Sequence, residues 1–501
     1  MVACLGAVAM ALALPKTNLY PLAPVGAAAC FWAWYGLTPK RAFWTGWAAG
    51  TLYFSLTFSW FGETAGQLIA PFGFLMTLLP AIGDGFFEFA LAGLTVAWLA
   101  AHVRTGWLPL GAAAAFALAE WLRCAGLGPF DVPFATLSLS QVEGPLAPLA
   151  AYGGSFGLTF VLALLGAEVA LVVRAPRAGA PVRGAALAAL VVLVATFAAW
   201  TDWPARRAPL PSMRVAAVQG NIPQSIKHDP GAILTAIRRY ETMTAALSSA
   251  KPSLVLWPET VIPVDLTRSP ALGAAFAGLA RSIGGELAVG TLQRTGGRDY
   301  NALVFYAPTG APDGAYQKHE LVPFAEALPF AFLEKLPYAN LIGRFARGET
   351  DGVTRVAGPG GSALGVGPLI CWESAFSDHA VADARAGADV LLVATDDAWF
   401  GTTAGPYQHA QIAQMRAIET GRWVLRAAST GISGIIAPDG RFTAATRLNE
   451  QTTLTGVVGA GVPTLYDRLG SPPLALAFAL LIALAAFAGR TRRQPGVSSP
   501  P

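Results

Sequence analysis

The chain divides near residue 200 into a first part with long apolar runs and a second part with short ones. An α-helix needs about 17 to 25 mostly apolar residues to cross roughly 30 Å of hydrocarbon. Runs near this length lie at 3–14, 19–36, 43–62, 70–102, 109–124, 155–173, 184–200 and 472–489. We therefore expect a multi-pass α-helical membrane bundle of about eight transmembrane helices, seven within residues 1–200 and the eighth at 472–489. Pro80 and Gly83 interrupt the fourth run, which could instead hold a re-entrant segment and a helix.

Residues 212–462 have a different pattern, with short β-rich runs separated by turns and by amphipathic stretches. This alternation is typical of a layered α/β domain. The expected strands are 214–218, 253–257, 285–291, 302–306, 363–370, 390–394, 423–428, 434–436 and 453–458, and the expected helices are 231–248, 271–283, 375–386 and 406–420. Asp313-Gly314 and Asp439-Gly440 are typical of hairpin turns. We interpret 201–211, with its three prolines, as a linker and 490–501 as a tail.

Composition supports this division. Charged residues make up 13% of the chain, against roughly 25% in an ordinary soluble domain, and only 15 of the 64 lie in residues 1–200. The formal net charge of +4 is small for 501 residues, and nothing in its distribution indicates a nucleic-acid partner.

Basic residues predict the orientation of the bundle, because short cytoplasmic loops carry an excess of Lys and Arg. Alternate loops hold Lys40, Arg41, Arg104, Arg174, Arg177 and Arg183, and the tail holds Arg490, Arg492 and Arg493. The opposite loops, near Lys16, Glu63, Asp131 and Glu143, are poor in basic residues. With eight spans, both termini are then cytoplasmic, and residues 212–462 lie on the periplasmic side of a bacterial inner membrane.

Ionisable side chains also occur inside the expected spans. Asp84 and Glu88 are four residues apart, Glu120 and Arg123 are three apart, and Glu168 stands alone. Such residues either pair inside a bundle or mark a substrate path. We favour pairing, because no ordered series of acids suggests a proton relay.

Cys371 is the only cysteine in residues 212–462, so a disulfide within that domain is impossible. It follows an expected strand and precedes an expected helix. A thiol at such a turn lies near helix N-terminal amides, which favour the thiolate. Cys371 is therefore a candidate nucleophile, although a lone cysteine is often a small buried apolar residue.

Two other residues have a placement that suits chemistry. Glu259 directly follows the expected strand at 253–257, and open sheets bind ligands at the carboxyl ends of their strands. Lys318 is a cation within a largely apolar stretch. Spacing alone does not separate either from an ordinary strand-end glutamate or surface lysine.

Together these segments resemble the carbon-nitrogen hydrolase (nitrilase) superfamily, whose mark is Glu, Lys and Cys in that chain order. Short sequence motifs narrow the resemblance to the apolipoprotein N-acyltransferase family. They are Val218 to Gln224, Trp257-Pro258-Glu259-Thr260, Lys318 to Glu326, Cys371-Trp372-Glu373, Asp397 to Gly401, Gly405 to His409 and Met415-Arg416-Ala417. In the first part, 119–123 and 152–156 also match.

The resemblance implies a nitrilase-like αββα sandwich between the seventh and eighth helices. It implies Cys371 as nucleophile, Glu259 as general base and Lys318 as the cation that stabilises an oxyanion. It also implies supporting or substrate-binding roles for Glu326, Glu373, Trp372 and Trp399, with Glu326 holding Lys318.

The implied reaction has two halves and needs no cofactor and no metal. Cys371 first takes an acyl chain from a phospholipid, typically phosphatidylethanolamine, as a thioester. The α-amine of an S-diacylglyceryl cysteine at the N-terminus of an apolipoprotein then accepts the chain. An amine attacks a thioester readily, and the product amide is stable. We expect a monomer.

Two positions depart from the family pattern. Lys227-His228 stand where the family usually has a Trp, and Asp396 stands where it usually has Asn. Separately, the long aromatic segment 324–346 has the composition of a lid over the site.

Four alternatives remain open. Gly153 to Gly157 match the G-x-S-x-G pattern of serine hydrolases, but they precede a membrane helix and suit close packing instead. His319, His379 or His409 could pair with the cysteine. The chain could be a membrane-tethered amidase or nitrilase acting on a small C–N substrate, or a non-catalytic transporter or scaffold.

Overall fold

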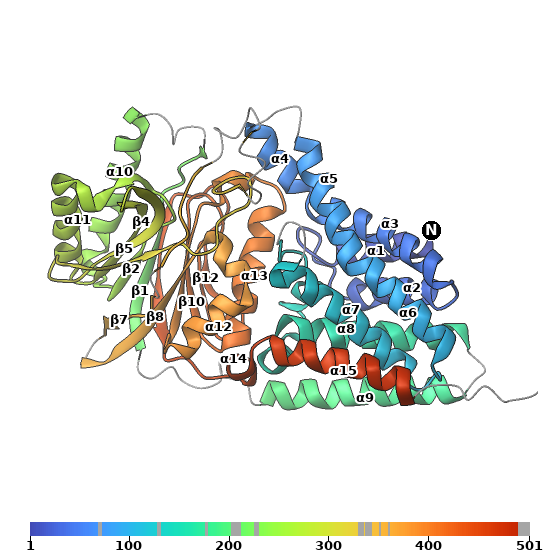
Figure 1. Ribbon diagram of the computed structural model, residues 1–501. Coiled ribbons are helices and arrows are strands. Elements are labelled where there is room, and N and C mark those ends of the chain that lie inside the picture. The colour runs from blue at the N-terminus through green and yellow to red at the C-terminus, as the bar shows by residue number, and fades with distance from the viewer. Residues whose placement is uncertain are drawn as a thin grey trace, which may run out of the picture.

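The computed structural model describes residues 1–68, 73–127, 132–175, 179–201, 212–224, 230–328, 335, 343–349, 352–358 and 361–488. The proposed linker from 202 onwards, most of the segment 324–346 and the tail 490–501 lie outside these residues. So do Asp131, Arg177, Lys227 and His228. A helical bundle and a two-sheet domain make up the described chain (Figure 1).

The bundle is built from apolar helices that approach closely at small residues. Its helices are α1 (Val2–Leu12), α2 (Leu22–Trp34), α3 (Pro39–Thr57), α4 (Ser59–Leu68), α5 (Gly73–Asp84), α6 (Leu91–His102), α7 (Leu108–Leu122), α8 (Ala150–Arg174), α9 (Gly179–Thr201) and α15 (Pro472–Ala488). Where α1 crosses α2, a Cβ on Gly6 would lie 2.5 Å from the carbonyl oxygen of Gly26, so only glycine allows this contact.

The described chain contains four helical stretches long and apolar enough to cross a membrane: Gly73–His102, Leu108–Ala125, Ala147–Arg174 and Pro181–Thr201. Val2–Leu12, Leu22–Trp34 and Pro472–Phe487 are shorter apolar helices. Pro80 does not divide its run, because a π-helical segment at Gly85–Ala90 (η2) continues α5 into α6. The run at 43–62 is instead broken at Phe58, between α3 and α4.

Two sheets form the core of the second domain. The first has the order β13 (Thr452–Gly459), β1 (Ser212–Gln219), β2 (Leu254–Leu256), β4 (Glu286–Thr295), β5 (Arg298–Tyr306) and β6 (Pro312–Gln317), with β3 (Ile262–Asp265) beside β4. The second has the order β12 (Phe442–Ala445), β11 (Gly434–Ile436), β10 (Trp423–Ala428), β9 (Val390–Thr395), β8 (Ala363–Ile370) and β7 (Thr354–Ala357). The central strands of each sheet are parallel.

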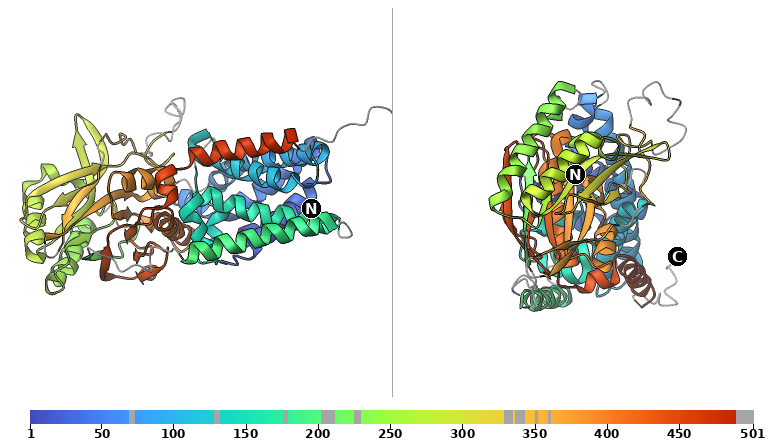
Figure 2. Two further views of the ribbon diagram at one scale, coloured as in Figure 1. Left: turned by 90° about the horizontal axis from the view of Figure 1, so that it is seen from below. Right: turned by 90° about the vertical axis from the view of Figure 1, so that its left-hand side faces the viewer.

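The sheets face each other and helices cover their outer faces, which gives the predicted αββα sandwich. Val215 and Ala217 of β1 share one buried apolar cluster with Val366 of β8 and Leu392 of β9, between the sheets. Helices α10 (Pro230–Ala245) and α11 (Pro270–Ile283) cover the first sheet. Helices α12 (Ser377–Arg385) and α13 (Gly405–Thr420) cover the second. Figure 2 shows this domain at one end of the bundle.

The nine strands expected from short apolar runs are all present. The sequence missed β3, β6, β7 and β12, which are short and partly exposed. Asp439-Gly440 forms the expected turn between β11 and β12. The prediction for Asp313-Gly314 was wrong, because both residues lie inside β6, where the register with β5 shifts, and the turn is at 307–311.

Helix α13 joins the two parts of the molecule. It lies between the second sheet and the bundle, where it packs on α8 (Figure 1). We call this contact between the two-sheet domain and the bundle the seam. Polar contacts fix it: Gln408 Nε2 donates to the carbonyl oxygen of Thr57, and Gln408 Oε1 accepts from Trp60 Nε1. Ile412 and Met415 belong to the same apolar cluster as the interior of the bundle. The domain therefore rests on the bundle through a continuous core.

Candidate active site

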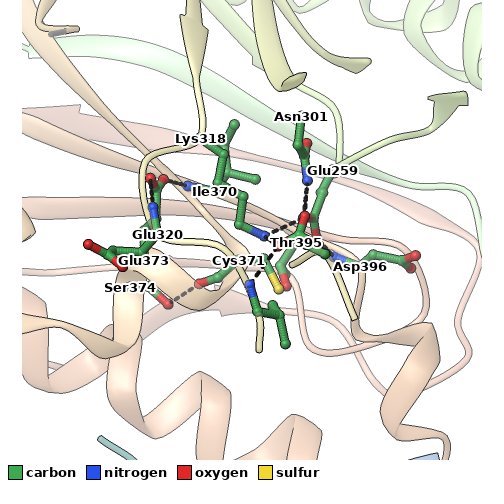
Figure 3. Close-up of polar contacts among 12 residues, drawn as sticks. Glu259, Asn301, Lys318, Glu320, Ile370, Cys371, Glu373, Ser374, Thr395 and Asp396 are labelled. Carbon is green, nitrogen blue, oxygen red and sulfur yellow. Dashed lines mark hydrogen bonds and ion pairs between the residues drawn. The ribbon is translucent and has the colours of Figure 1, made fainter. Parts of the chain in front are cut away.

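Glu259, Lys318 and Cys371 come together where strands of both sheets end (Figure 3). Glu259 follows β2, Lys318 directly follows β6, and Cys371 directly follows β8. The first two belong to one sheet and the cysteine to the other, so the site lies across the mouth of the sandwich. All three side chains are buried.

Lys318 is held by two carboxylates. Its Nζ lies 2.9 Å from Glu259 Oε1 and 2.8 Å from Glu326 Oε2. Burial by itself lowers the pKa of Lys318, but the two carboxylates outweigh this and raise its pKa well above the ordinary value. The lysine is therefore a fixed cation at neutral pH and does not act as a base.

Glu259 is oriented by donors on both of its oxygens. Asn301 Nδ2 donates to Oε1 at 2.7 Å and the backbone N–H of Asp396 donates to Oε2 at 2.9 Å. The same amide of Asn301 also donates to Glu326 Oε1, at 2.8 Å. These donors hold the carboxylate of Glu259 in one orientation beside Lys318.

The turn that carries Cys371 has an unusual backbone. Cys371 has φ of 52°, in the left-handed region that a residue with a Cβ adopts only at a cost, and it begins a short 3₁₀ helix, Cys371–Ala375. Glu373 stabilises the turn, since its Oε2 accepts from the N–H of Ile370 at 2.6 Å. The surrounding hydrogen bonds keep this strained conformation, which turns the chain away from the direction of β8 at Cys371.

Glu373 also connects the nucleophile turn with the segment that carries the lysine. Its Oε1 accepts from the hydroxyl of Tyr316 at 2.9 Å and from the N–H of His319 at 2.6 Å. Burial raises the pKa of Glu373, although the N–H donors of Ile370 and His319 oppose the rise. One carboxyl group thus fixes the position of Lys318 relative to Cys371 across the two sheets.

The protonation of Cys371 differs from our expectation. We expected helix N-terminal amides to favour the thiolate, but burial and the charge of Glu259 raise the pKa of the thiol well above its ordinary value. Lys318 opposes this rise without cancelling it. The resting cysteine is therefore a neutral thiol, and the helix that follows it is too short to supply a strong dipole. A neutral thiol needs a base to become a nucleophile.

The three histidines that could have formed a Cys–His pair have other neighbours. His409 Nε2 lies 3.1 Å from the carbonyl oxygen of Cys371, and its Nδ1 lies 2.9 Å from Asp397 Oδ1. His319 stacks on Tyr316. His379 lies 3.7 Å from Glu320. His409 thus supports the backbone of the nucleophile turn.

Trp372 and Trp399 are both near the seam between the domain and the bundle. Trp372 is buried and stacks on Phe134 of the bundle, with ring centroids 5.1 Å apart. Trp399 is partly buried, and its carbonyl oxygen accepts from the hydroxyl of Thr64, which lies on α4.

The G-x-S-x-G motif has a packing role. Gly154 has φ of 61° at the start of α8, and a Cβ there would lie 2.3 Å from the ring of Tyr466. The hydroxyl and N–H of Ser155 both donate to Glu419 Oε1, at 2.6 and 2.7 Å. Ser155 therefore helps to join α8 to α13.

Most of the intramembrane acids pair or form hydrogen bonds inside the bundle, as we expected. Arg123 Nε donates to Glu88 Oε2 at 2.6 Å, and Arg123 Nη1 lies 3.6 Å from Asp84. Glu120 instead accepts from Thr159 and from the N–H of Leu137.

The sequence did not reveal Asn301 or the N–H of Asp396. Neither an asparagine within a strand nor a backbone amide has a sequence signature that points to Glu259. Within the described residues, no group of three or more His, Cys, Asp or Glu side chains is arranged to hold a metal ion.

The arrangement suits acyl transfer through a covalent intermediate. A thiol, a carboxylate that can take its proton and a fixed ammonium are buried together, where electrostatic stabilisation of an oxyanion is stronger than in water.

Comparison with known proteins identifies the family of both parts. A family model described as carbon-nitrogen hydrolase matches residues 214–461, and one described as apolipoprotein N-acyltransferase N-terminal domain matches residues 6–167. The apolipoprotein N-acyltransferase of Azotobacter vinelandii is 35% identical over 97% of this chain and 94% of its own length. Those of Pseudomonas putida and Shewanella oneidensis are 33% and 32% identical, over 96% and 97% of this chain and 94% of theirs. The chain therefore belongs to the apolipoprotein N-acyltransferase family.

Proposed function

We propose that this protein transfers a fatty acyl chain from a phospholipid to the N-terminal α-amine of an S-diacylglyceryl apolipoprotein, through a thioester on Cys371. Phosphatidylethanolamine is the proposed donor, and the enzyme acts as a monomer without a cofactor or metal. The names of its relatives support the lipoprotein substrate.

In the first half-reaction, Glu259 takes the proton of the Cys371 thiol as Sγ attacks the ester carbonyl carbon. Lys318 stabilises the oxyanion of the tetrahedral intermediate. The C–O bond then breaks, and the lysophospholipid leaves with the proton from Glu259. Glu326 keeps Lys318 in place, consistent with their 2.8 Å contact.

In the second half-reaction, the α-amine of the acceptor attacks the thioester carbonyl carbon. Glu259 takes a proton from the nitrogen, the C–S bond breaks, and the thiol recovers its proton. The same base serves both halves because each begins by deprotonating a nucleophile.

Both substrates are lipid-anchored, so we propose that the bundle spans the inner membrane eight times and keeps the site at its periplasmic surface. Residues 1–200 contain seven spans, 201–211 a linker, 212–462 the catalytic domain, 472–489 the eighth span and 490–501 a cytoplasmic tail. Both termini are then cytoplasmic. Trp372 and Trp399, at the seam, would line the approach of the acyl chains.

The observation that carries this proposal is the direct packing of the nucleophile turn on the bundle. Trp372, next to Cys371, belongs to the same buried cluster as Phe54 and Phe116 of the bundle. An amidase for small water-soluble substrates gains nothing from such contact, whereas a lipid substrate requires a site beside hydrocarbon.

Mass spectrometry of the purified protein after incubation with phosphatidylethanolamine tests the proposal. We expect a hydroxylamine-labile adduct of one acyl mass on Cys371, which an S-diacylglyceryl peptide then removes. Cys371→Ala should carry no adduct. Glu259→Gln should slow adduct formation by about 10²-fold or more, as loss of a general base predicts.

Cys4→Ala is a matched control, since it removes a cysteine of the bundle and should leave the adduct unchanged. Absence of an adduct together with release of ammonia from small amides would favour the amidase. A Glu259→Gln variant with the wild-type rate would remove Glu259 from the mechanism.

A further inference from the structure

The segment between α7 and α8 enters the seam between the bundle and the catalytic domain. From Val132 to Gln141 every residue is buried, although the segment has little regular structure apart from a 3₁₀ helix at Leu137–Gln141. We call 132–141 the seam loop. Burial of an irregular loop requires partners for its backbone groups.

Three buried side chains of the bundle supply such partners. Arg123 Nη1 donates to the carbonyl oxygen of Val132. The hydroxyl of Tyr53 donates to the carbonyl oxygen of Ala135 at 2.7 Å. Glu120 Oε2 accepts from the N–H of Leu137 at 2.8 Å. Tyr53 lies on α3, whereas Glu120 lies on α7 and Arg123 directly follows it. The loop is therefore fixed to the bundle at three successive points by residues of two helices.

Arg123 is itself held in place. Its guanidinium pairs with Glu88 at 2.6 Å and lies over the ring of Phe54, 4.8 Å from the centroid. Its side chain is fully buried. The intramembrane ion pair therefore anchors the first residue of the seam loop.

The backbone of the seam loop is strained at Ala135, where φ is 57°. A residue with a Cβ keeps this left-handed conformation only where surrounding contacts impose it. The hydrogen bond from Tyr53 ends on this residue. The contact thus fixes the conformation beside the neighbouring side chain, Phe134.

Phe134 is fully buried against the nucleophile turn. Its ring is stacked on Trp372 with an interplanar angle of 25°. It also lies 5.8 Å from the ring of His409, whose Nε2 contacts the carbonyl oxygen of Cys371. One side chain of the bundle therefore touches both residues that flank or support the nucleophile.

We infer that Phe134 is a positioning residue for Cys371, and that Tyr53 acts through it by fixing the seam loop. The inference rests on the proposed function, because Cys371 must be the nucleophile. Through this contact the membrane bundle sets the orientation of the nucleophile turn, in addition to binding lipid. A displacement of about 1 Å at a reacting group can reduce a rate about 10²-fold.

The test is the single-turnover acylation of Cys371 by phosphatidylethanolamine in detergent micelles. Phe134→Leu removes the stacking ring but keeps an apolar side chain, and Tyr53→Phe removes only one hydroxyl. Tyr35→Phe is the matched control, because the hydroxyl of Tyr35 also donates to a bundle carbonyl, that of Ala167 at 3.4 Å, away from the seam loop.

We expect the acylation rate constant to fall about 10²-fold in Phe134→Leu and about 10-fold in Tyr53→Phe, and to stay unchanged in Tyr35→Phe. The fraction of enzyme that becomes acylated and the phospholipid concentration for half-maximal rate should not change. The double variant should be no slower than Phe134→Leu, because both changes act through one ring.

A lower acylated fraction with an unchanged rate constant would mean that the two residues only support folding, and it would overturn the inference. Wild-type rates in both variants would overturn it too. If the wild-type enzyme itself forms no thioester, the proposed function fails, and that result is distinct from both of these.

Discussion

Cys371 combines a buried, neutral thiol with neighbours of both charges. Glu259 disfavours the thiolate and Lys318 favours it, but burial is the largest influence and the pKa is raised. In the proposed mechanism, proton transfer to Glu259 therefore has to accompany attack, and the ion pair of Lys318 with Glu259 reorganises as the oxyanion forms. A thiol is also less easily oxidised than a thiolate, since the thiolate is the reactive form.

The raised pKa predicts how Cys371 reacts with iodoacetamide in the absence of phospholipid. Below its pKa the thiolate fraction rises about tenfold per pH unit, so alkylation should keep rising from pH 7 to pH 10 without a plateau. Peptide mass spectrometry quantifies the modified Cys371. Unfolded protein is the control and should level off near the ordinary thiol pKa of about 8.5. A plateau below pH 8 in the folded enzyme would mean that the resting cysteine is a thiolate.

Some site residues could be predicted from the sequence and others could not. Glu259 and Cys371 follow apolar runs that are typical of strands, so their positions at strand ends could be predicted from the sequence. The role of Asn301 could not be predicted from the sequence, because it depends on pairing between β5 and β4 and on the path of the chain to Glu326. The pKa of Cys371 was also beyond reach, since it depends on burial by residues distant in the chain.

At the scale of elements, helix α8 shows how one glycine joins the two parts of the molecule. Gly154 breaks the regular backbone at the start of the helix and allows the ring of Tyr466, on α14 (Leu465–Leu469), to approach. Ser155 can then reach Glu419 on α13. The motif that resembles a serine nucleophile is therefore a structural joint.

Gly154→Ala should destabilise the protein by about 3 kcal/mol or more, because it adds a strained backbone and a clash with Tyr466. Gly153→Ala is the matched control, as a Cβ there has nothing within 4 Å and the backbone is helical. Thermal unfolding in detergent measures both variants. Equal melting temperatures would show that Tyr466 can move aside at little cost.

The elements that the sequence predicted are those with long or uninterrupted apolar runs, since burial on all sides leaves a clear pattern. The strands it missed, such as β7 and β12, have only four residues each, and every second residue is exposed. The prediction of a turn at Asp313-Gly314 was wrong because a glycine inside a strand can also mark a shift of register between two paired strands.

For the whole molecule, the seam between the domain and the bundle was the least predictable feature. Its contacts join residues hundreds of positions apart, such as Trp60 with Gln408, and no local pattern encodes them. The division at residue 200, by contrast, follows directly from the change in charge density. The bundle and the domain therefore have separate signatures in the sequence, while the site depends on their contact.

The proposed topology predicts which surfaces a membrane-impermeant maleimide can reach. In intact spheroplasts, Arg298→Cys in the catalytic domain should be labelled, because its side chain is 59% exposed and the proposed topology puts this domain on the periplasmic side. Arg41→Cys, in the first turn of α3 and on the proposed cytoplasmic side, should be labelled only after permeabilisation. The wild-type protein gives the background from native cysteines. Labelling of Arg41→Cys in intact cells would reverse the orientation.

The pairing of β1 with β13 brings together the first and last strands of the catalytic domain, from Ser212 with Gly459 to Gln219 with Thr452. During synthesis, β1 can pair with β2 early, but its other edge stays open until the ribosome has added more than two hundred further residues. The sheet can thus be completed only just before α15, the last described helix, emerges. A chain truncated in this interval lacks β13, so β1 keeps an unpaired edge that can pair with the strands of other chains.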